Sequence, residues 1–229
     1  MHIEVGVVES AKMVLSYGTA TAAFGYLAKQ TWDAIKESGM ISLAVRTLAT
    51  TLLVLSFFEV LPHHPVGISE VHLILGSTLF LIFGLVPAGI GLAAGLLIQG
   101  LFFAPFDLPN YAVNVTTLLV PLYAMSVLAK KIIPANMAYK DLSYAQTVKL
   151  SLAYQGGIIS WVAFWALYGQ GFGAENLASV GTFAAAYATV VLVEPIIDIA
   201  VLAGAKALDR MKNSGLVTAR LYHSETADA

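Results

Sequence analysis

Cysteine is missing from the 229-residue sequence. Its absence excludes disulfide bonds, thiolate zinc sites, iron–sulfur clusters and cysteine nucleophiles. A metal ion bound by this chain would therefore need nitrogen or oxygen ligands.

Charged residues are scarce. They make up 11% of the sequence, against about 25% in an average soluble domain, while 58% of the residues are hydrophobic and the mean hydropathy is +0.78. A soluble fold could not hide that much apolar surface, so we expect an integral membrane protein with an all-α fold. The net charge of -2 provides no basic field, so we expect no nucleic-acid partner.

Several enzyme motifs are also missing. The sequence has no Gly-x-x-x-x-Gly-Lys-Ser/Thr phosphate loop, no Gly-x-Ser-x-Gly elbow and no His-Glu-x-x-His helix. The last apolar stretch has no lysine before Lys206, which argues against a retinal protein. We expect no catalytic activity and no organic cofactor.

Seven stretches are long and apolar enough to suggest transmembrane helices, which need about 20 mostly apolar residues. The third and fourth are short and nearly contiguous, which indicates either a tight helical hairpin or two partial crossings. We expect a single helical domain over residues 1–210 and a polar cytoplasmic tail over 211–229. The predicted spans are 8–28, 41–61, 68–84, 86–104, 111–133, 147–169 and 178–204.

The basic residues indicate the orientation, because lysine and arginine accumulate in cytoplasmic loops. The loops 62–67, 105–110 and 170–177 contain none. With seven spans this predicts an outer N-terminus, a cytoplasmic C-terminus and a multi-pass protein of the plasma membrane. Lys12 is the one basic residue outside the cytoplasmic set, which comprises Lys29, Lys36, Arg46, Lys130, Lys131, Lys140, Lys149, Lys206, Arg210, Lys212 and Arg220.

The first two residues are a candidate metal chelate. The sequence opens Met1-His2-Ile3-Glu4, which does not resemble a cleavable signal peptide, so we expect Met1 to be retained. The α-amine, the backbone nitrogen of His2 and a ring nitrogen of His2 can close adjacent chelate rings, and nitrogen-rich sets suit Ni(II) or Cu(II). The alternative is that His2 belongs to a frayed terminus.

Further histidines lie on the predicted outer side. His72 stands at the start of the third span, where a histidine in a membrane domain is a functional candidate, and it is the candidate fourth ligand. Its alternative is a histidine hydrogen-bonded to loop backbone. His63 and His64, with Glu59 one helical turn earlier, suggest a second metal site or an entry path, or simply solvated side chains.

Two acids occur inside the last span. Glu194 precedes Pro195, and Asp198 lies four residues later on the same helix face. Acids in membranes tend to face the interior of the bundle. They are candidates for a proton relay or for docking a partner, and the sequence does not separate these roles.

Three motifs resemble the CbiM/NikM family, the substrate-binding membrane subunits of energy-coupling-factor transporters for cobalt and nickel. They are Met1-His2-Ile3-x-x-Gly6, then Val71-His72-Leu73 before a glycine-rich hairpin, and Leu97-x-Gln99-Gly100-Leu101-Phe102-Phe103-Ala104 leading to Asn114. The resemblance extends over roughly residues 1–130. The rest of the chain resembles the family only in its hydropathy.

The resemblance implies a site and partners. The ligands would be the α-amine of Met1, the backbone and ring of His2, and the ring of His72, with Asn114 orienting a histidine. The transported substrate would be Co(II) or Ni(II). The partners would be a transmembrane coupling subunit, a pair of cytoplasmic ATPases and a small accessory membrane subunit.

The sequence departs from the family pattern at two places. Pro105-Phe106-Asp107 replaces a His-Gly-Gly run, and Glu70 replaces a small hydroxyl residue before Val71-His72. A carboxylate near the ion would favour a less nickel-like setting, although Glu70 could instead face water or pair with His64. Two other functions stay open, a proton-coupled metal transporter that uses Glu194 and Asp198, and a histidine-ligated redox subunit.

Overall fold

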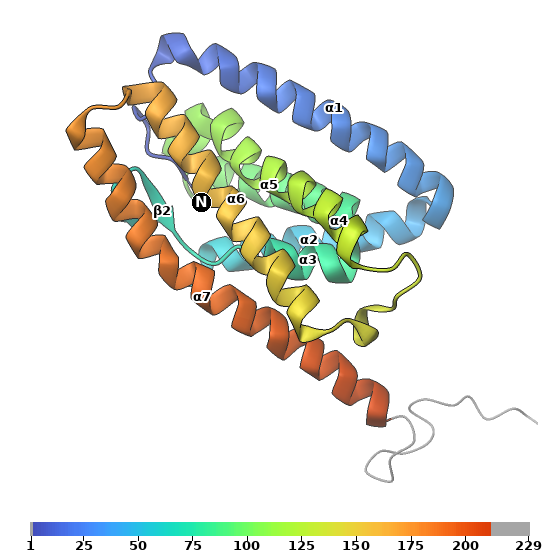
Figure 1. Ribbon diagram of the computed structural model, residues 1–229. Coiled ribbons are helices and arrows are strands. Elements are labelled where there is room, and N and C mark those ends of the chain that lie inside the picture. The colour runs from blue at the N-terminus through green and yellow to red at the C-terminus, as the bar shows by residue number, and fades with distance from the viewer. Residues whose placement is uncertain (1, 212–229) are drawn as a thin grey trace, which may run out of the picture.

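The computed structural model describes residues 2–211. The predicted tail lies almost wholly outside the described residues, as does Met1. Within them the chain is an all-α bundle with one small hairpin of two antiparallel strands (Figure 1). The elements are α1 (Met13–Ser38), α2 (Met40–Glu59), β1 (His64–Val66), β2 (Ser69–Val71), α3 (Gly76–Phe83), α4 (Leu85–Phe102), α5 (Tyr111–Ile132), α6 (Tyr144–Gln170) and α7 (Ala174–Met211).

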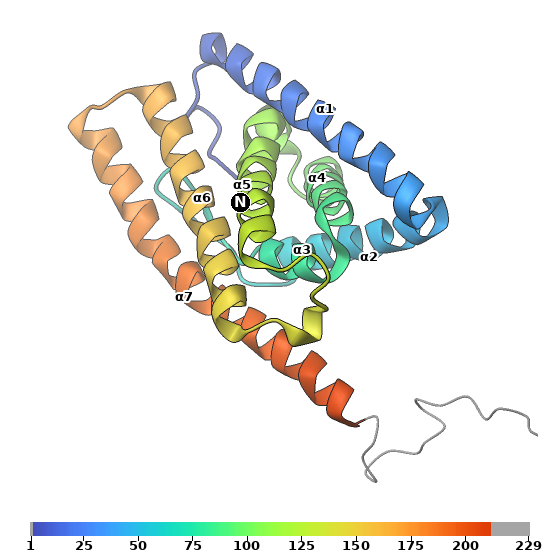
Figure 2. The ribbon, with the colours of Figure 1, turned by 45° about the vertical axis from the view of Figure 1, so that its right-hand side comes forward.

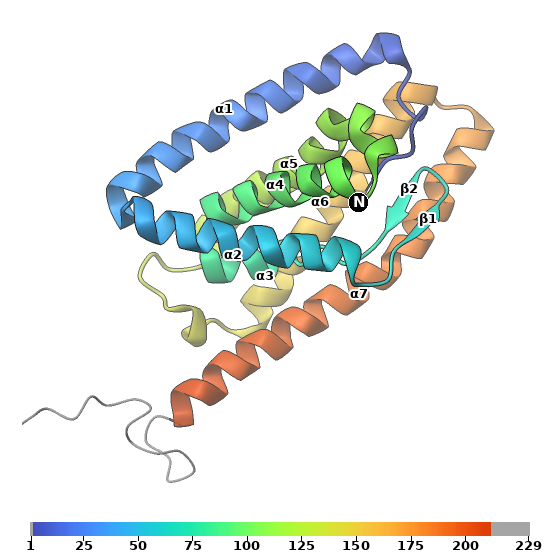
Figure 3. The ribbon, with the colours of Figure 1, turned by 180° about the vertical axis from the view of Figure 1, so that it is seen from behind.

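The helices α4, α5 and α6 form the centre of the bundle, and α1 and α7 lie on opposite flanks (Figure 2). Seen from behind, α2 crosses α4, and the β hairpin lies at one end of the bundle beside α7 (Figure 3). Gly91 and Gly95 of α4 face Thr50 and Val54 of α2, where an added Cβ would overlap both side chains. Small residues four positions apart are the usual means by which membrane helices approach closely.

Five helices among the described residues are long and apolar enough to cross a membrane, namely α2, α4, α5, α6 and α7. The helix α1 has the necessary length, with 26 residues, but Lys29, Asp33, Lys36 and Glu37 make its last turns polar. It begins five residues later than the predicted span 8–28 and ends ten residues beyond it. The bundle architecture expected from hydropathy is confirmed.

The third pass differs from the expected helix over 68–84. Residues 69–71 form β2, residues 72–75 are not helical, and only the eight residues of α3 are helical. Eight residues rise about 12 Å, well below the roughly 30 Å of hydrocarbon in a bilayer. The helix α3 is therefore too short to cross the bilayer by itself.

Candidate metal site

The N-terminal segment lies inside the bundle and runs beside the hairpin. Ile3 stands opposite Ser69 in an antiparallel bridge, the backbone N–H of Glu4 donates to the Ile68 carbonyl (3.0 Å), and the N–H of Glu70 donates to the His2 carbonyl (2.9 Å). Ile3 is fully buried. From His2 onward the chain is therefore not a frayed terminus.

Side chains from three elements fix the backbone of this segment. Asn114 of α5 accepts from the Ile3 N–H (2.8 Å), Asn110 donates to the Ile3 carbonyl (2.9 Å), and the Ser69 hydroxyl donates to the His2 carbonyl (2.9 Å). The resemblance implied that Asn114 orients a histidine. Its side chain bonds to the backbone of Ile3, the residue that follows His2.

The other side of the segment rests on the end of α6. Gly169 leaves room for the chain, because a Cβ there would overlap the carbonyl of Val7. Lys12 donates to the Gly169 carbonyl (2.6 Å) and also pairs with Glu9 (3.4 Å), three residues before it. The N-terminal segment is thus held by the hairpin and α5 on one side and by the end of α6 on the other.

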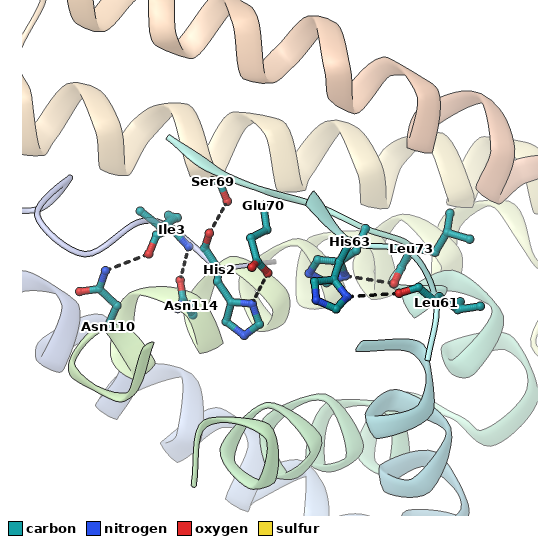
Figure 4. Close-up of polar contacts among 10 residues, drawn as sticks. His2, Ile3, Leu61, His63, Ser69, Glu70, Leu73, Asn110 and Asn114 are labelled. Carbon is teal, nitrogen blue, oxygen red and sulfur yellow. Dashed lines mark hydrogen bonds and ion pairs between the residues drawn. The ribbon is translucent and has the colours of Figure 1, made fainter. Parts of the chain in front are cut away.

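The docked segment brings His2 next to two residues of the hairpin region. Ligand atoms of His2, Glu70 and His72 lie within 4.8 Å of one another, and Nδ1 of His2 is 2.7 Å from Oε2 of Glu70 (Figure 4). His2 and His72 are each 3% exposed. Glu70 and His72 are 68 and 70 positions away from His2 in the sequence, yet the three side chains form one compact cluster.

The two histidines present free ring nitrogens in this cluster. Nδ1 of His72 lies 3.2 Å from the Leu73 carbonyl. Nε2 of both His2 and His72 is buried and has no hydrogen-bond partner among the described residues. Phe58 packs edge-on against both rings, at 6.2 Å and 4.8 Å between centroids. Buried polar atoms without partners are rare, and neutral imidazole nitrogens are the commonest metal ligands.

Glu70 carries negative charge into the cluster. Burial alone would raise the pKa of the Glu70 carboxyl, but the hydrogen bond with His2 and the electrostatic attraction between the two side chains lower the pKa below its ordinary value. Glu4 shows the opposite shift, because burial, followed by the charges of Glu70 and Asp107, raises its pKa. Negative potential therefore collects at this end of the molecule, which suits a cation.

Other predicted candidates lie outside the cluster. His63 is exposed and contacts the carbonyl of Leu61 (3.2 Å), and His64 is exposed in β1, opposite Val71. Glu59 ends α2 and is half-buried. Glu70 pairs with His2, so the suggested pairing with His64 is wrong.

Glu194 is fully buried and bonds to the start of the third helix. It accepts from the backbone N–H groups of Ile74 and of Leu75 (2.9 Å), and from the side chain of Gln155. Leu75 has a positive φ of 55°, where the chain turns into α3. Non-helical backbone at membrane depth needs such internal partners, and Glu194 supplies them at Ile74 and Leu75, the second and third residues after His72.

Asp198 continues the same arrangement one turn later. It accepts from the hydroxyls of Ser77 (2.7 Å) and Thr78 in the first turn of α3. An acid at a helix N-terminus is stabilised by the helix dipole. Both acids therefore fasten α7 to α3.

Sequence reasoning missed Phe58, Asn110, Ser69 and Gly169. Ser69 directly precedes Glu70 and offered a weak signal. The other three have no local signal, because each acts through a contact with a distant part of the chain.

The comparisons with known proteins agree with this architecture. A family model described as "Cobalt uptake substrate-specific transmembrane region", CbiM, matches residues 2–211. The chain belongs to the CbiM family. Among solved structures, a truncated transition metal transporter aligns with a TM-score of 0.66 over 92% of this chain and 99% of that chain, at 14% identity, which shows a shared fold. No curated protein matches the chain significantly.

Membership of the CbiM family confirms the family suggested by the three motifs. CbiM is a family of transporters, and membership indicates that this chain is the substrate-binding membrane component of a cobalt or nickel uptake system. A metal is accordingly the transported substrate, and the chain is a membrane protein.

Proposed function

We propose that this CbiM protein captures Co(II) or Ni(II) from the outer side of the plasma membrane, as the substrate-binding subunit of an energy-coupling-factor transporter. The observation that carries the proposal is the buried cluster of His2, Glu70 and His72. Nδ1 of His2 lies in this cluster, and Nε2 of His72 has no hydrogen-bond partner among the described residues, so its lone pair is available to an ion that accepts nitrogen ligands.

The proposed ligands are the α-amine of Met1, the backbone and ring of His2, and the ring of His72. Met1 lies outside the described residues, and its role follows from its position next to His2. The fastening of Ile3 by Asn114 and Ser69 supports the proposal, because it limits the motion of the chain end that carries the amine.

The chain itself is proposed to be non-catalytic. Energy would come from a pair of cytoplasmic ATPases through a transmembrane coupling subunit, with a small accessory membrane subunit as a further partner. The one-sided distribution of lysine and arginine supports an outer N-terminus and a cytoplasmic C-terminus, which would face the site outward and the tail toward the ATPases.

A pair of fusion proteins tests the amine. An extension at the N-terminus should abolish high-affinity binding of Co(II) and Ni(II), whereas the same extension at the C-terminus should leave it intact. Calorimetric metal titration of both proteins measures the difference. Equal affinities in the two fusions would refute the amine as a ligand.

A second pair of variants tests the histidines. His72→Ala should weaken binding more than about 100-fold, because losing a direct ligand should exceed the 10- to 100-fold cost of losing an outer-shell partner. His64→Ala removes an exposed imidazole near the same hairpin and should leave the affinity unchanged. Equal effects of the two substitutions would contradict the assignment.

Transport assays separate the rival functions. Uptake that continues without the ATPases and collapses with an uncoupler would indicate a proton-coupled transporter. Iron or copper retained after purification, with a visible colour, would indicate a redox subunit. We expect neither, and expect uptake to require ATP.

A further inference from the structure

Glu70 differs from an ordinary orienting residue in the atom that it contacts. Its Oε2 lies 2.7 Å from Nδ1 of His2, and Nδ1 is the ring nitrogen that can close a six-membered chelate ring with the backbone nitrogen of the same residue. Metal–ligand bonds of about 2.1 Å place two ligands at right angles about 3 Å apart. Without any ion present, these atoms are thus already close to the spacing of neighbouring ligands.

The surroundings of Glu70 also fit a ligand. Its carboxylate belongs to the same group of atoms, within 4.8 Å of one another, as His2 and His72, and its side chain is only 17% exposed. An ion carrying two positive charges is costly to bury without compensating charge. Imidazoles supply none, and the carboxylate supplies one negative charge.

We propose that Glu70 gives a carboxylate oxygen to the same ion as His2 and His72, and that this oxygen shifts the preference of the site toward Co(II) and away from Ni(II). The proposal rests on the proposed function and names the substrate within its class. Nitrogen-rich planar sets suit Ni(II) and Cu(II), whereas carboxylate oxygen suits metals with more ligands and less planar geometry. A fifth, oxygen donor therefore removes the advantage that a planar nitrogen set gives Ni(II).

Two substitutions at Glu70 test the proposal in the full-length protein with an unmodified N-terminus. Glu70→Gln keeps the size and an acceptor for His2 but is a poor ligand, and Glu70→Ser leaves only a small hydroxyl. Each should lower the ratio of Co(II) to Ni(II) affinity about tenfold or more, a change of the size seen when metal-site partners are removed. Glu175→Gln is the control, because it removes an exposed acid at the start of α7 and should leave the ratio unchanged.

Spectroscopy of the Co(II)-loaded protein provides a second readout. X-ray absorption should show more than four nitrogen or oxygen ligands in the unsubstituted protein and one fewer in Glu70→Gln, and the visible Co(II) bands should change accordingly. An outer-shell role would leave the ligand number unchanged. Thermal unfolding of each variant shows whether it is folded. If Glu70→Gln does not fold, Glu70→Ser replaces it in both measurements.

The outcomes separate this inference from the proposed function. Failure of the unsubstituted protein to bind either metal would overturn both. Binding of both metals with an unchanged affinity ratio and unchanged ligand number in a folded Glu70 variant would overturn the inference alone. An equal loss of affinity for both metals would do the same, because it would show positioning without selectivity.

Discussion

Replacing Asn114 with alanine should loosen the N-terminal segment from the bundle. The Asn114 side chain is 1% exposed, and its Oδ1 accepts from the Ile3 N–H at 2.8 Å. Alanine would leave that N–H without a partner in a buried place, at a cost of about 1–3 kcal/mol. The equilibrium constant for docking should therefore fall by about 5- to 150-fold.

Hydrogen exchange measures this equilibrium in the metal-free protein. The amide of Glu70 is the suitable probe, because it donates to the His2 carbonyl (2.9 Å) and loses that acceptor when the segment undocks. The amide of Ile3 is unsuitable, since the substitution removes its own acceptor. Apparent metal affinity should fall with the docked fraction.

Thr117→Ala is the matched control for general destabilisation. Thr117 is buried in the same helix, and its hydroxyl donates to the Val113 carbonyl within that helix (2.9 Å). The control should lower the unfolding temperature without changing exchange at Glu70. Equal exchange at Glu70 in the Asn114 variant and the unsubstituted protein would refute the role of Asn114 in docking.

Three further predictions concern other contacts of the site. Gly169→Ala should displace Val7 and weaken metal binding about tenfold or more. Gly156→Ala, in the same helix, should leave the affinity unchanged, because a Cβ added there has no atom within 4 Å. Equal metal affinities of the two variants in titration would contradict this prediction. Glu194→Ala should lower the unfolding temperature, because it leaves two backbone N–H groups at the start of α3 unpaired; unchanged stability with lost uptake would instead favour a proton relay. Since the pKa of Glu70 is lowered, its hydrogen bond with His2 should stabilise the docked segment above about pH 4.3 and lose this effect as the pH falls through the folded-state pKa. Hydrogen exchange of residues 2–8 should rise over that pH range, but not in Glu70→Gln.

Hydropathy was sufficient to predict most of the bundle. The helices α2, α4 and α5 begin and end within two residues of the predicted spans, because the apolar runs are long and interrupted by polar loops. The range 68–75 is equally apolar but not helical. Its backbone N–H groups at Ile74 and Leu75 are satisfied by Glu194, about 120 residues away, and no local pattern reports such a partner.

The site was predictable only in part, because some of its contacts join residues that are distant in the sequence. The resemblance and the topology indicated His2 and His72, and the structure brings them together. The pairing of His2 with Glu70 and the bond from Ile3 to Asn114 depend on how the first residues enter the bundle. That entry is set by contacts with α5, α6 and the hairpin, which the sequence near residue 2 does not contain.

The bonds from Glu194 to the backbone beside His72 couple the tilt of α7 to the position of that backbone. Glu194 lies 17 residues before Met211, where α7 ends, a distance of about 25 Å along the axis. A tilt of only 5° about that end would carry the carboxylate through about 2 Å, close to the length of one metal–ligand bond. Because the carboxylate holds the N–H groups of Ile74 and Leu75, such a tilt would pull on the backbone two residues from the His72 ring.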